Sequence, residues 1–90
     1  MEHFNITVFG KVQGVFFRAN AKTLAENLGL AGWCKNELDG TVRIEVEGKI
    51  DPLEKFVLWC YKGSEYSNVI DVKVEKGEVK GYDLFEIKRF

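Results

Sequence analysis

A nine-residue stretch with two glycines and an arginine carries the strongest chemical signal in this sequence. It reads Gly10-Lys11-Val12-Gln13-Gly14-Val15-Phe16-Phe17-Arg18. Glycine lacks the Cβ that disfavours positive φ, so the two glycines allow a tight bend whose backbone N–H groups turn inward. Such a ring of amides attracts an anion, and a helix that starts just after Phe17 adds its positive end. The guanidinium of Arg18 can hold two phosphate oxygens at once.

This stretch predicts a phosphate-binding loop over residues 13 to 18, with Arg18 at its rim. An ordinary turn between a strand and a helix, with a surface arginine, is the alternative, and the loop alone does not choose between them. The candidate phosphate-binding residues are Gln13, Gly14, Val15, Phe16, Phe17 and Arg18.

Asn36 is the second candidate for a role in chemistry. It follows Gly32-Trp33-Cys34-Lys35 near the predicted end of a strand. Its amide offers both a donor and an acceptor, so it can hold a water molecule but cannot deprotonate it. The alternative is a turn residue beside Asp39-Gly40.

The remaining reactive residue types favour structural roles. His3 is the only histidine and lies near the N-terminus, so we expect it on the surface and expect neither a histidine base nor a phosphohistidine. Cys34 and Cys60 lack metal-binding spacing, so no metal and no cofactor are expected. We expect both thiols to be free and packed as small apolar residues, with a disulfide as the alternative.

Length and composition indicate one domain spanning residues 1–90. Hydrophobic residues make up 46% and charged residues 30% of the chain, which is typical of a globular protein. Thirteen basic and fourteen acidic residues leave a net charge of −1, so no overall basic field would collect nucleic acid or anionic membrane. The N-terminus lacks the pattern of a secretory signal, and no apolar run is long enough to span a membrane. We therefore expect a cytoplasmic protein.

Hydrophobic periodicity predicts the elements that position the loop and Asn36. Residues 4–8 alternate as in a strand, and from Ala19 an apolar stripe of helical period runs to a stop at Gly29. Residues 30–36 return to extended structure, and Asp39-Gly40 predicts a hairpin turn into a half-buried strand over residues 41–47.

A second helix is predicted from Asp51 as the cap, with Pro52 at the first helical position and Glu54 bonding back. Its apolar stripe ends at Gly63. Two further strands follow, over residues 69–75, with Ile70, Val72 and Val74 on one face, and over residues 84–90. Two helices with single apolar stripes, covering one face of a mainly antiparallel sheet, predict a ferredoxin-like α+β sandwich of order βαββαβ plus a closing strand.

Three segments of the sequence stand out together: Gly10 to Arg18, Leu28-Gly29-Leu30-Ala31-Gly32-Trp33-Cys34-Lys35-Asn36, and Asp39-Gly40-Thr41-Val42. In order and spacing they resemble the signature of the acylphosphatase family. The resemblance extends over almost the whole chain, including Gly63-Ser64 after the second helix. Phe16 stands where many members carry glycine, Cys34 replaces a common valine, and residues 63–67 lack a proline often seen there.

The resemblance implies a small ferredoxin-like enzyme that hydrolyses the carboxyl–phosphate bond of acyl phosphates without a metal. It implies phosphate binding by Arg18 with the loop amides of residues 13 to 18, and positioning of water by Asn36. The expected partner is a small acyl phosphate, with no nucleic acid and no membrane. A monomer is the simplest expectation.

Two alternatives of other classes stay open. RNA-binding modules share this fold and stack bases on the sheet face. Here Arg43, Glu45 and Glu47 occupy the outward positions of the third strand, and the two acids would repel phosphates. A non-catalytic anion-binding domain would keep Arg18 but would have no use for Asn36.

Overall fold

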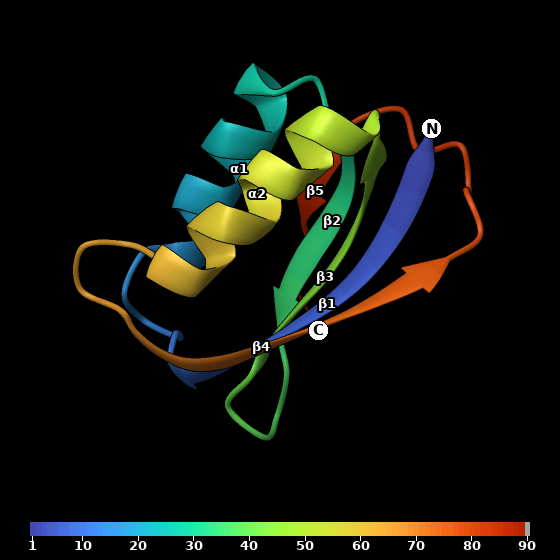
Figure 1. Cartoon of the computed structure of the whole chain (residues 1–90). Helices are drawn as coiled ribbons and strands as arrows, with labels where there is room; N and C mark the ends of the chain where they lie inside the picture. Colours follow the sequence, from blue (N-terminus) through green and yellow to red (C-terminus); the bar gives the residue numbers. More distant parts are fainter. Residues whose placement is uncertain (90) are drawn as a thin grey trace.

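A five-stranded sheet carries two helices on one of its faces in the computed structural model, which describes residues 1–89 (Figure 1). This arrangement confirms the predicted ferredoxin-like α+β fold. In chain order the elements are β1 (Glu2–Lys11), α1 (Phe17–Asn27), β2 (Ala31–Asn36), β3 (Val42–Gly48), α2 (Ile50–Lys62), β4 (Asn68–Gly77) and β5 (Phe85–Ile87).

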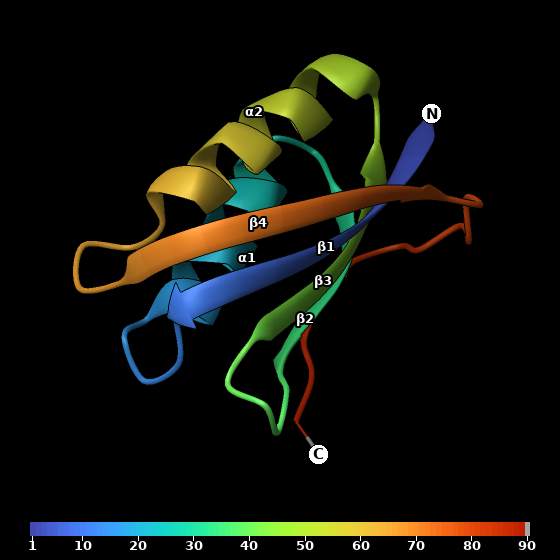
Figure 2. The same ribbon diagram turned by 60° about the horizontal axis from the view of Figure 1, so that its bottom comes forward.

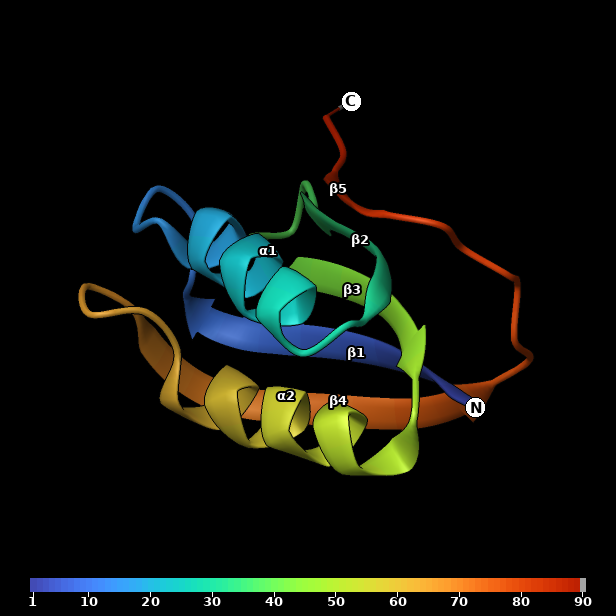
Figure 3. The same ribbon diagram turned by 90° about the horizontal axis from the view of Figure 1, so that it is seen from above.

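The strands are arranged in the order β4-β1-β3-β2-β5. Pairing is antiparallel throughout except between β2 and β5, which run parallel. Figure 2 shows β4 along one edge of the sheet, and Figure 3 shows the two helices side by side on the same face of the sheet. Because strand side chains alternate between the two faces, every second residue of β1 and β3 points toward the helices. These residues form the centre of the core: Phe4, Ile6, Val8, Val42, Ile44 and Val46.

The core fixes where α1 begins. Phe17, its first residue, is fully buried, and its ring lies 4.8 Å from that of Trp59 on α2, measured between centroids. Burial of a phenylalanine stabilises a fold by roughly 1.5–3 kcal/mol. Because Phe17 is anchored in the core, the next residue, Arg18, lies half-buried in the first turn of the helix, at the boundary between core and solvent.

The two helices differ in how well their ends were predicted. At the end of α1, Gly29 adopts a φ of 71°, and the N–H groups of Gly29 and Leu30 bond the carbonyls of Glu26 and Ala25. This closure confirms the predicted stop. The predicted start of α2 is wrong: the helix begins at Ile50, and Lys49 precedes it without any side-chain cap.

As a result, Asp51 and Pro52 lie inside the first turn of α2 instead of capping it. A proline is tolerated there because the first turn has no helical acceptor for its missing N–H. Asp51 still lies near the positive end of the helix dipole, which favours its charge.

An irregularity between β1 and β4 corrects two further expectations. The register shifts between Phe9 and Gly10, so Ile70 has no partner on β1 and is 76% exposed, unlike the buried Val72. Gly10 belongs to β1 and not to the loop. A Cβ at this position would lie 2.1 Å from the carbonyl oxygen of Asn68, so only glycine allows the two strands to approach this closely.

The C-terminal strand is shorter than predicted. It covers Phe85–Ile87 instead of residues 84–90, and Phe90 lies outside the described residues. Within residues 1–89, no helix has both the length and the apolar character needed to cross a membrane.

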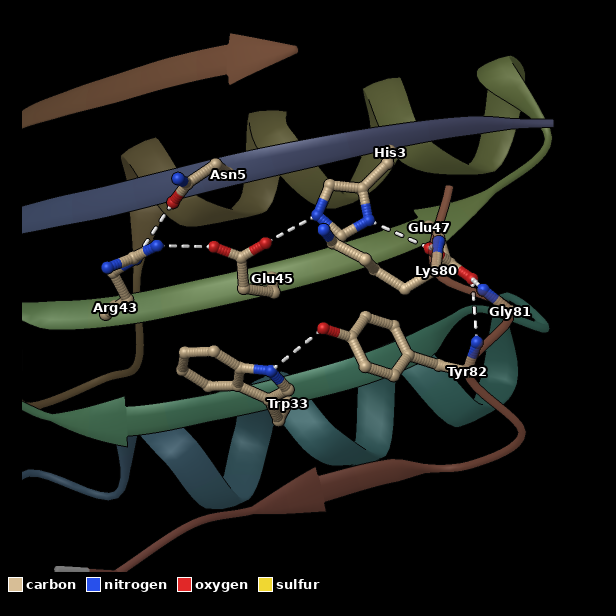
Figure 4. Close-up of polar contacts among 9 residues, drawn as sticks. All are labelled: His3, Asn5, Trp33, Arg43, Glu45, Glu47, Lys80, Gly81 and Tyr82. Carbon is tan, nitrogen blue, oxygen red and sulfur yellow. Dashed lines mark hydrogen bonds and ion pairs between the residues drawn. The ribbon is translucent and has the colours of Figure 1, made fainter. Parts of the chain in front are cut away.

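The sheet face opposite the helices holds a buried polar network, shown in Figure 4. His3 was expected on the surface, but it is only 2% exposed. Its Nδ1 lies 2.8 Å from the carboxylate of Glu47, and its Nε2 lies 2.5 Å from that of Glu45. Glu45 also accepts a hydrogen bond of 2.6 Å from Arg43. Both glutamates lie on the sheet face opposite the helices, as the alternation predicts, but they are buried there instead of open to solvent.

The connection between β4 and β5 covers this network. The backbone N–H groups of Lys80, Gly81 and Tyr82 all donate to the Glu47 carboxylate, at 2.7 to 2.8 Å. The indole N–H of Trp33 donates to the hydroxyl of Tyr82 over 3.2 Å. A sheet face occupied in this way is not the open platform that an RNA-recognition module uses.

Candidate active site

The loop between β1 and α1 bends sharply over residues 12 to 16. Gly14 has a φ of 72°, and Phe16 has a φ of 64° and a ψ of 17°, so both are left-handed. For a residue with a side chain, this conformation costs roughly 1–2 kcal/mol. Phe16 is the only non-glycine residue with positive φ within residues 1–89, and its ring is 69% exposed. Strain concentrated directly before a helix is typical of a loop shaped for binding.

The bend places the first turn of α1 against a cleft of about 260 Å³. The N–H groups of residues 17 to 19 have no acceptor within the helix, and the first bonded one is that of Asn20, 3.1 Å from the Phe16 carbonyl. Unpaired amides at a helix N-terminus attract anions. The half-buried Arg18 lines the same cleft with Val12, Gly14, Phe16, Phe17, Ala19, Ile87 and Arg89.

Two side chains hold the loop from opposite sides. The buried hydroxyl of Ser64, just after α2, donates to the Val15 carbonyl over 2.7 Å. The side-chain amide of Gln13 donates to the carbonyls of Glu37 and Thr41, at 2.8 and 2.9 Å. Because that amide is turned to the β2–β3 hairpin, Gln13 can offer a phosphate only its backbone N–H.

Asn36 ends β2 on the same face of the strand as the buried Cys34, which points toward the helices. The Cys34 sulfur lies 3.9 Å from the backbone carbonyl of Arg18, so this face of β2 borders the start of α1. Within residues 1–89, the Oδ1 of Asn36 is the one buried side-chain oxygen or nitrogen without a hydrogen-bond partner. A buried acceptor of this kind calls for a donor.

The turn of the hairpin is made by another residue. The Asp39 carboxylate accepts hydrogen bonds from the backbone N–H and the hydroxyl of Thr41, at 3.0 and 2.7 Å. Both hydrogen bonds lower the pKa of Asp39, and the one from the Thr41 hydroxyl has the larger effect. Asn36 makes no such contact, and the observed geometry does not support its alternative assignment as a turn residue.

The comparisons with known proteins place this architecture in a family. The model of the acylphosphatase family matches residues 4–87. The chain belongs to the acylphosphatase family. An acylphosphatase of Haloarcula marismortui is 41% identical over 90 residues, covering 98% of this chain and 99% of the relative.

Solved acylphosphatases have the same fold. The crystal structure of the Bacillus subtilis acylphosphatase matches with a TM-score of 0.96 at 39% identity, covering 99% of this chain and 100% of that one. Full-length HypF in its phosphate- and nucleotide-bound form matches with a TM-score of 0.92 at 31% identity. The match covers 98% of this chain but only 12% of HypF.

In this acylphosphatase-family chain both cysteines are buried and free, as expected. Burial raises the pKa of the Cys34 thiol to about 12, although the charges of Arg18 and Lys22 oppose the rise. Burial also raises the pKa of Cys60. These shifts disfavour the thiolate at neutral pH, so neither cysteine is suited to act as a nucleophile, although the Cys34 sulfur contacts the Arg18 carbonyl.

Ser64, Ile87 and Arg89 were missed as site residues in this acylphosphatase-family sequence. The Gly63-Ser64 pair in the sequence could have pointed to Ser64, because a glycine at the end of a helix often marks a backbone position that needs glycine. The structure shows such a position: Gly63 adopts a φ of 75°, and a Cβ there would lie 2.2 Å from the hydroxyl of Ser67. Ile87 and Arg89 reach the cleft only because β5 pairs with β2, which no local pattern reports. Within residues 1–89, no cluster of three or more His, Cys, Asp or Glu side chains could hold a metal ion.

Proposed function

We propose that this chain hydrolyses the carboxyl–phosphate bond of acyl phosphates, releasing a carboxylate and inorganic phosphate. Membership of the acylphosphatase family supports this activity. The observation that carries the proposal is that the strained loop leads into Arg18, whose backbone carbonyl contacts β2, the strand that ends at Asn36 with its unpartnered amide oxygen.

Phosphate binding is assigned to the loop and to the start of α1. The guanidinium of Arg18 and backbone N–H groups of residues 13 to 18 would surround the phosphoryl oxygens, whose negative charge spreads over the equatorial positions in the transition state. The loop contributes Gln13, Gly14, Val15, Phe16 and Phe17 through their amides. Because these groups are held in place before substrate arrives, little reorganisation is needed as charge develops.

Water positioning is assigned to Asn36. Its Oδ1 would accept a hydrogen bond from the attacking water and aim the lone pair of that water at phosphorus. The leaving group is a carboxylate, a weak base that departs without protonation, so no strong general acid is required. Water loses a proton as the new P–O bond forms, and a phosphate oxygen of the substrate is the proposed acceptor.

The test is hydrolysis of acetyl phosphate and benzoyl phosphate by purified protein in the presence of a chelator. We expect turnover by the unmodified chain and loss of most turnover in Asn36→Ala, while phosphate affinity measured by calorimetry stays nearly unchanged. Arg18→Lys should weaken phosphate binding and turnover together, because lysine lacks the bidentate fork. Circular dichroism checks that each variant is folded.

Two outcomes contradict this proposal in different ways. A folded Asn36→Ala variant with near-normal turnover would remove the water-positioning role but leave the activity intact. Loss of activity with the chelator, restored by a divalent ion, would exclude the metal-free mechanism.

We also propose that the protein is a cytoplasmic monomer. Two free, buried cysteines are typical of proteins that stay in a reducing compartment. Light scattering after size exclusion tests the monomer, with a dimer mass as the contrary result. Fractionation of cells tests the location, with recovery outside the cytoplasm as the contrary result.

A further inference from the structure

The proposed site is assembled from two separate segments of the chain. Arg18 and the loop amides follow β1, whereas Asn36 belongs to the hairpin that joins β2 and β3. Within residues 1–89, both side-chain hydrogen bonds that join the loop to this hairpin come from Gln13. Its amide therefore joins the segment that would bind phosphate to the segment that carries Asn36.

The contacts of Gln13 are directed at the base of the hairpin. Its Nε2 donates to the carbonyls of Glu37 and Thr41, and these two residues also pair with each other through the 2.9 Å bond from Glu37 N–H to the Thr41 carbonyl. Glu37 directly follows Asn36. The two protons of the Gln13 amide are both used in these bonds, which leaves none of them for substrate.

We infer that Gln13 is a positioning residue, which holds Asn36 in register with the phosphate-binding loop. The inference rests on the proposed roles of Arg18 and Asn36. A water molecule attacks phosphorus productively only from the side opposite the leaving group, and a misplacement of about 1 Å can cost about a hundredfold in rate. A double hydrogen bond at the base of the hairpin restrains that distance and direction.

Ser64 provides a matched contrast. It holds the same loop by one hydrogen bond, but from the opposite side and without touching the hairpin. Loosening Ser64 should disturb the loop and hence phosphate affinity. When Gln13 is loosened, Ser64 still holds the Val15 carbonyl, so the change should move Asn36 more than the loop and should fall mainly on turnover.

The experiment compares Gln13→Met, which keeps the length of the side chain without its donors, with Ser64→Ala. In Gln13→Met the Glu37 carbonyl still accepts a hydrogen bond from the Gly40 N–H, and the Thr41 carbonyl still accepts one from the Glu37 N–H. Neither carbonyl is therefore left without a donor. We expect kcat for benzoyl phosphate to fall about 10- to 100-fold in Gln13→Met, with phosphate affinity within about twofold of the unmodified chain. Ser64→Ala should weaken phosphate affinity by the larger factor.

The decisive readout is the double variant Gln13→Met with Asn36→Ala. If Gln13 acts through Asn36, adding Gln13→Met to the Asn36→Ala variant should lower kcat by less than about twofold. The reason is that substitutions of residues that act as a unit are not additive. An equal fall in both backgrounds would overturn the inference, as would unchanged kcat in Gln13→Met alone.

Failure of the proposed function is recognised separately. It would appear as an inactive unmodified chain or an active Asn36→Ala variant, before Gln13 is changed. If Gln13→Met does not fold, Gln13→Asn serves in its place, because it keeps the polar amide but is one methylene too short to reach both carbonyls.

Discussion

Replacing Glu47 by glutamine should destabilise this protein more than almost any other single polar substitution. The side chain is 2% exposed, and its two oxygens accept four hydrogen bonds, from the ring of His3 and from three successive backbone N–H groups, residues 80 to 82. Glutamine turns one of the two oxygens into an NH₂ group. Each carboxylate oxygen accepts two of these bonds, so the new amide faces two donors that have lost their acceptor.

The cost follows from those donors. A donor left without its acceptor costs about 1–3 kcal/mol, and two donors lose their acceptor here. We therefore expect Glu47→Gln to lower the free energy of unfolding by about 2–4 kcal/mol. For a domain of this size, about 3 kcal/mol corresponds to a fall in Tm of about 12–24 °C.

Urea titration followed by circular dichroism, together with a thermal melt, measures the change. Glu75→Gln is the control, because Glu75 is an exposed glutamate on the edge strand β4 and should change stability by no more than about 0.5 kcal/mol. If the two variants lose the same small amount, the network around Glu47 does not stabilise the fold and the reasoning fails.

Three further predictions concern pH, thiols and phosphate. Burial raises the pKa of Glu47, but hydrogen bonds from Lys80, His3, Tyr82 and Gly81 outweigh it and lower the pKa. The resulting stability is present above the ordinary glutamate pKa and is lost as the pH falls toward the lowered value, so urea midpoints should drop below about pH 4.5. A flat midpoint down to pH 3 would contradict this. At pH 8 iodoacetamide should leave the native Cys34 thiol unlabelled, because its pKa is about 12, and should label it after unfolding; mass spectrometry decides. Inorganic phosphate should inhibit competitively, and a purely noncompetitive pattern would argue against phosphate binding at Arg18.

Much of the fold could be predicted because each element carries its own local pattern. The alternation in β1 and β3 and the stop at Gly29 are read from neighbouring residues, and the structure confirms them. The start of α2 shows the limit of such patterns. Asp51 matches a cap signature, but the cap position is set by where the backbone leaves its extended conformation, and it does so after Lys49.

The errors at His3 and Ile70 have a tertiary cause. The burial of His3 depends on the connection that covers it, and that connection lies at the far end of the chain. The exposure of Ile70 depends on a register shift that only the partner strand reveals. For Asn36 the sequence motif predicted a place in the site. The structure adds the unpartnered Oδ1, which no sequence pattern contains. The role of Asn36 in catalysis stays a prediction.

The position of β1 in the sheet has a consequence for how the protein reaches its native state. The first strand made by the ribosome lies between β3 and β4, and His3 is opposite Gly77 in the second of these pairings. The hydrogen bonds between β1 and β4 cannot form until the chain has been synthesised as far as residue 77. Folding dominated by contacts between distant residues is slow, because the entropy of closing long loops is lost before those contacts stabilise the chain. During synthesis, β1 therefore has an unpaired edge, and the cell must keep that edge from pairing with other chains.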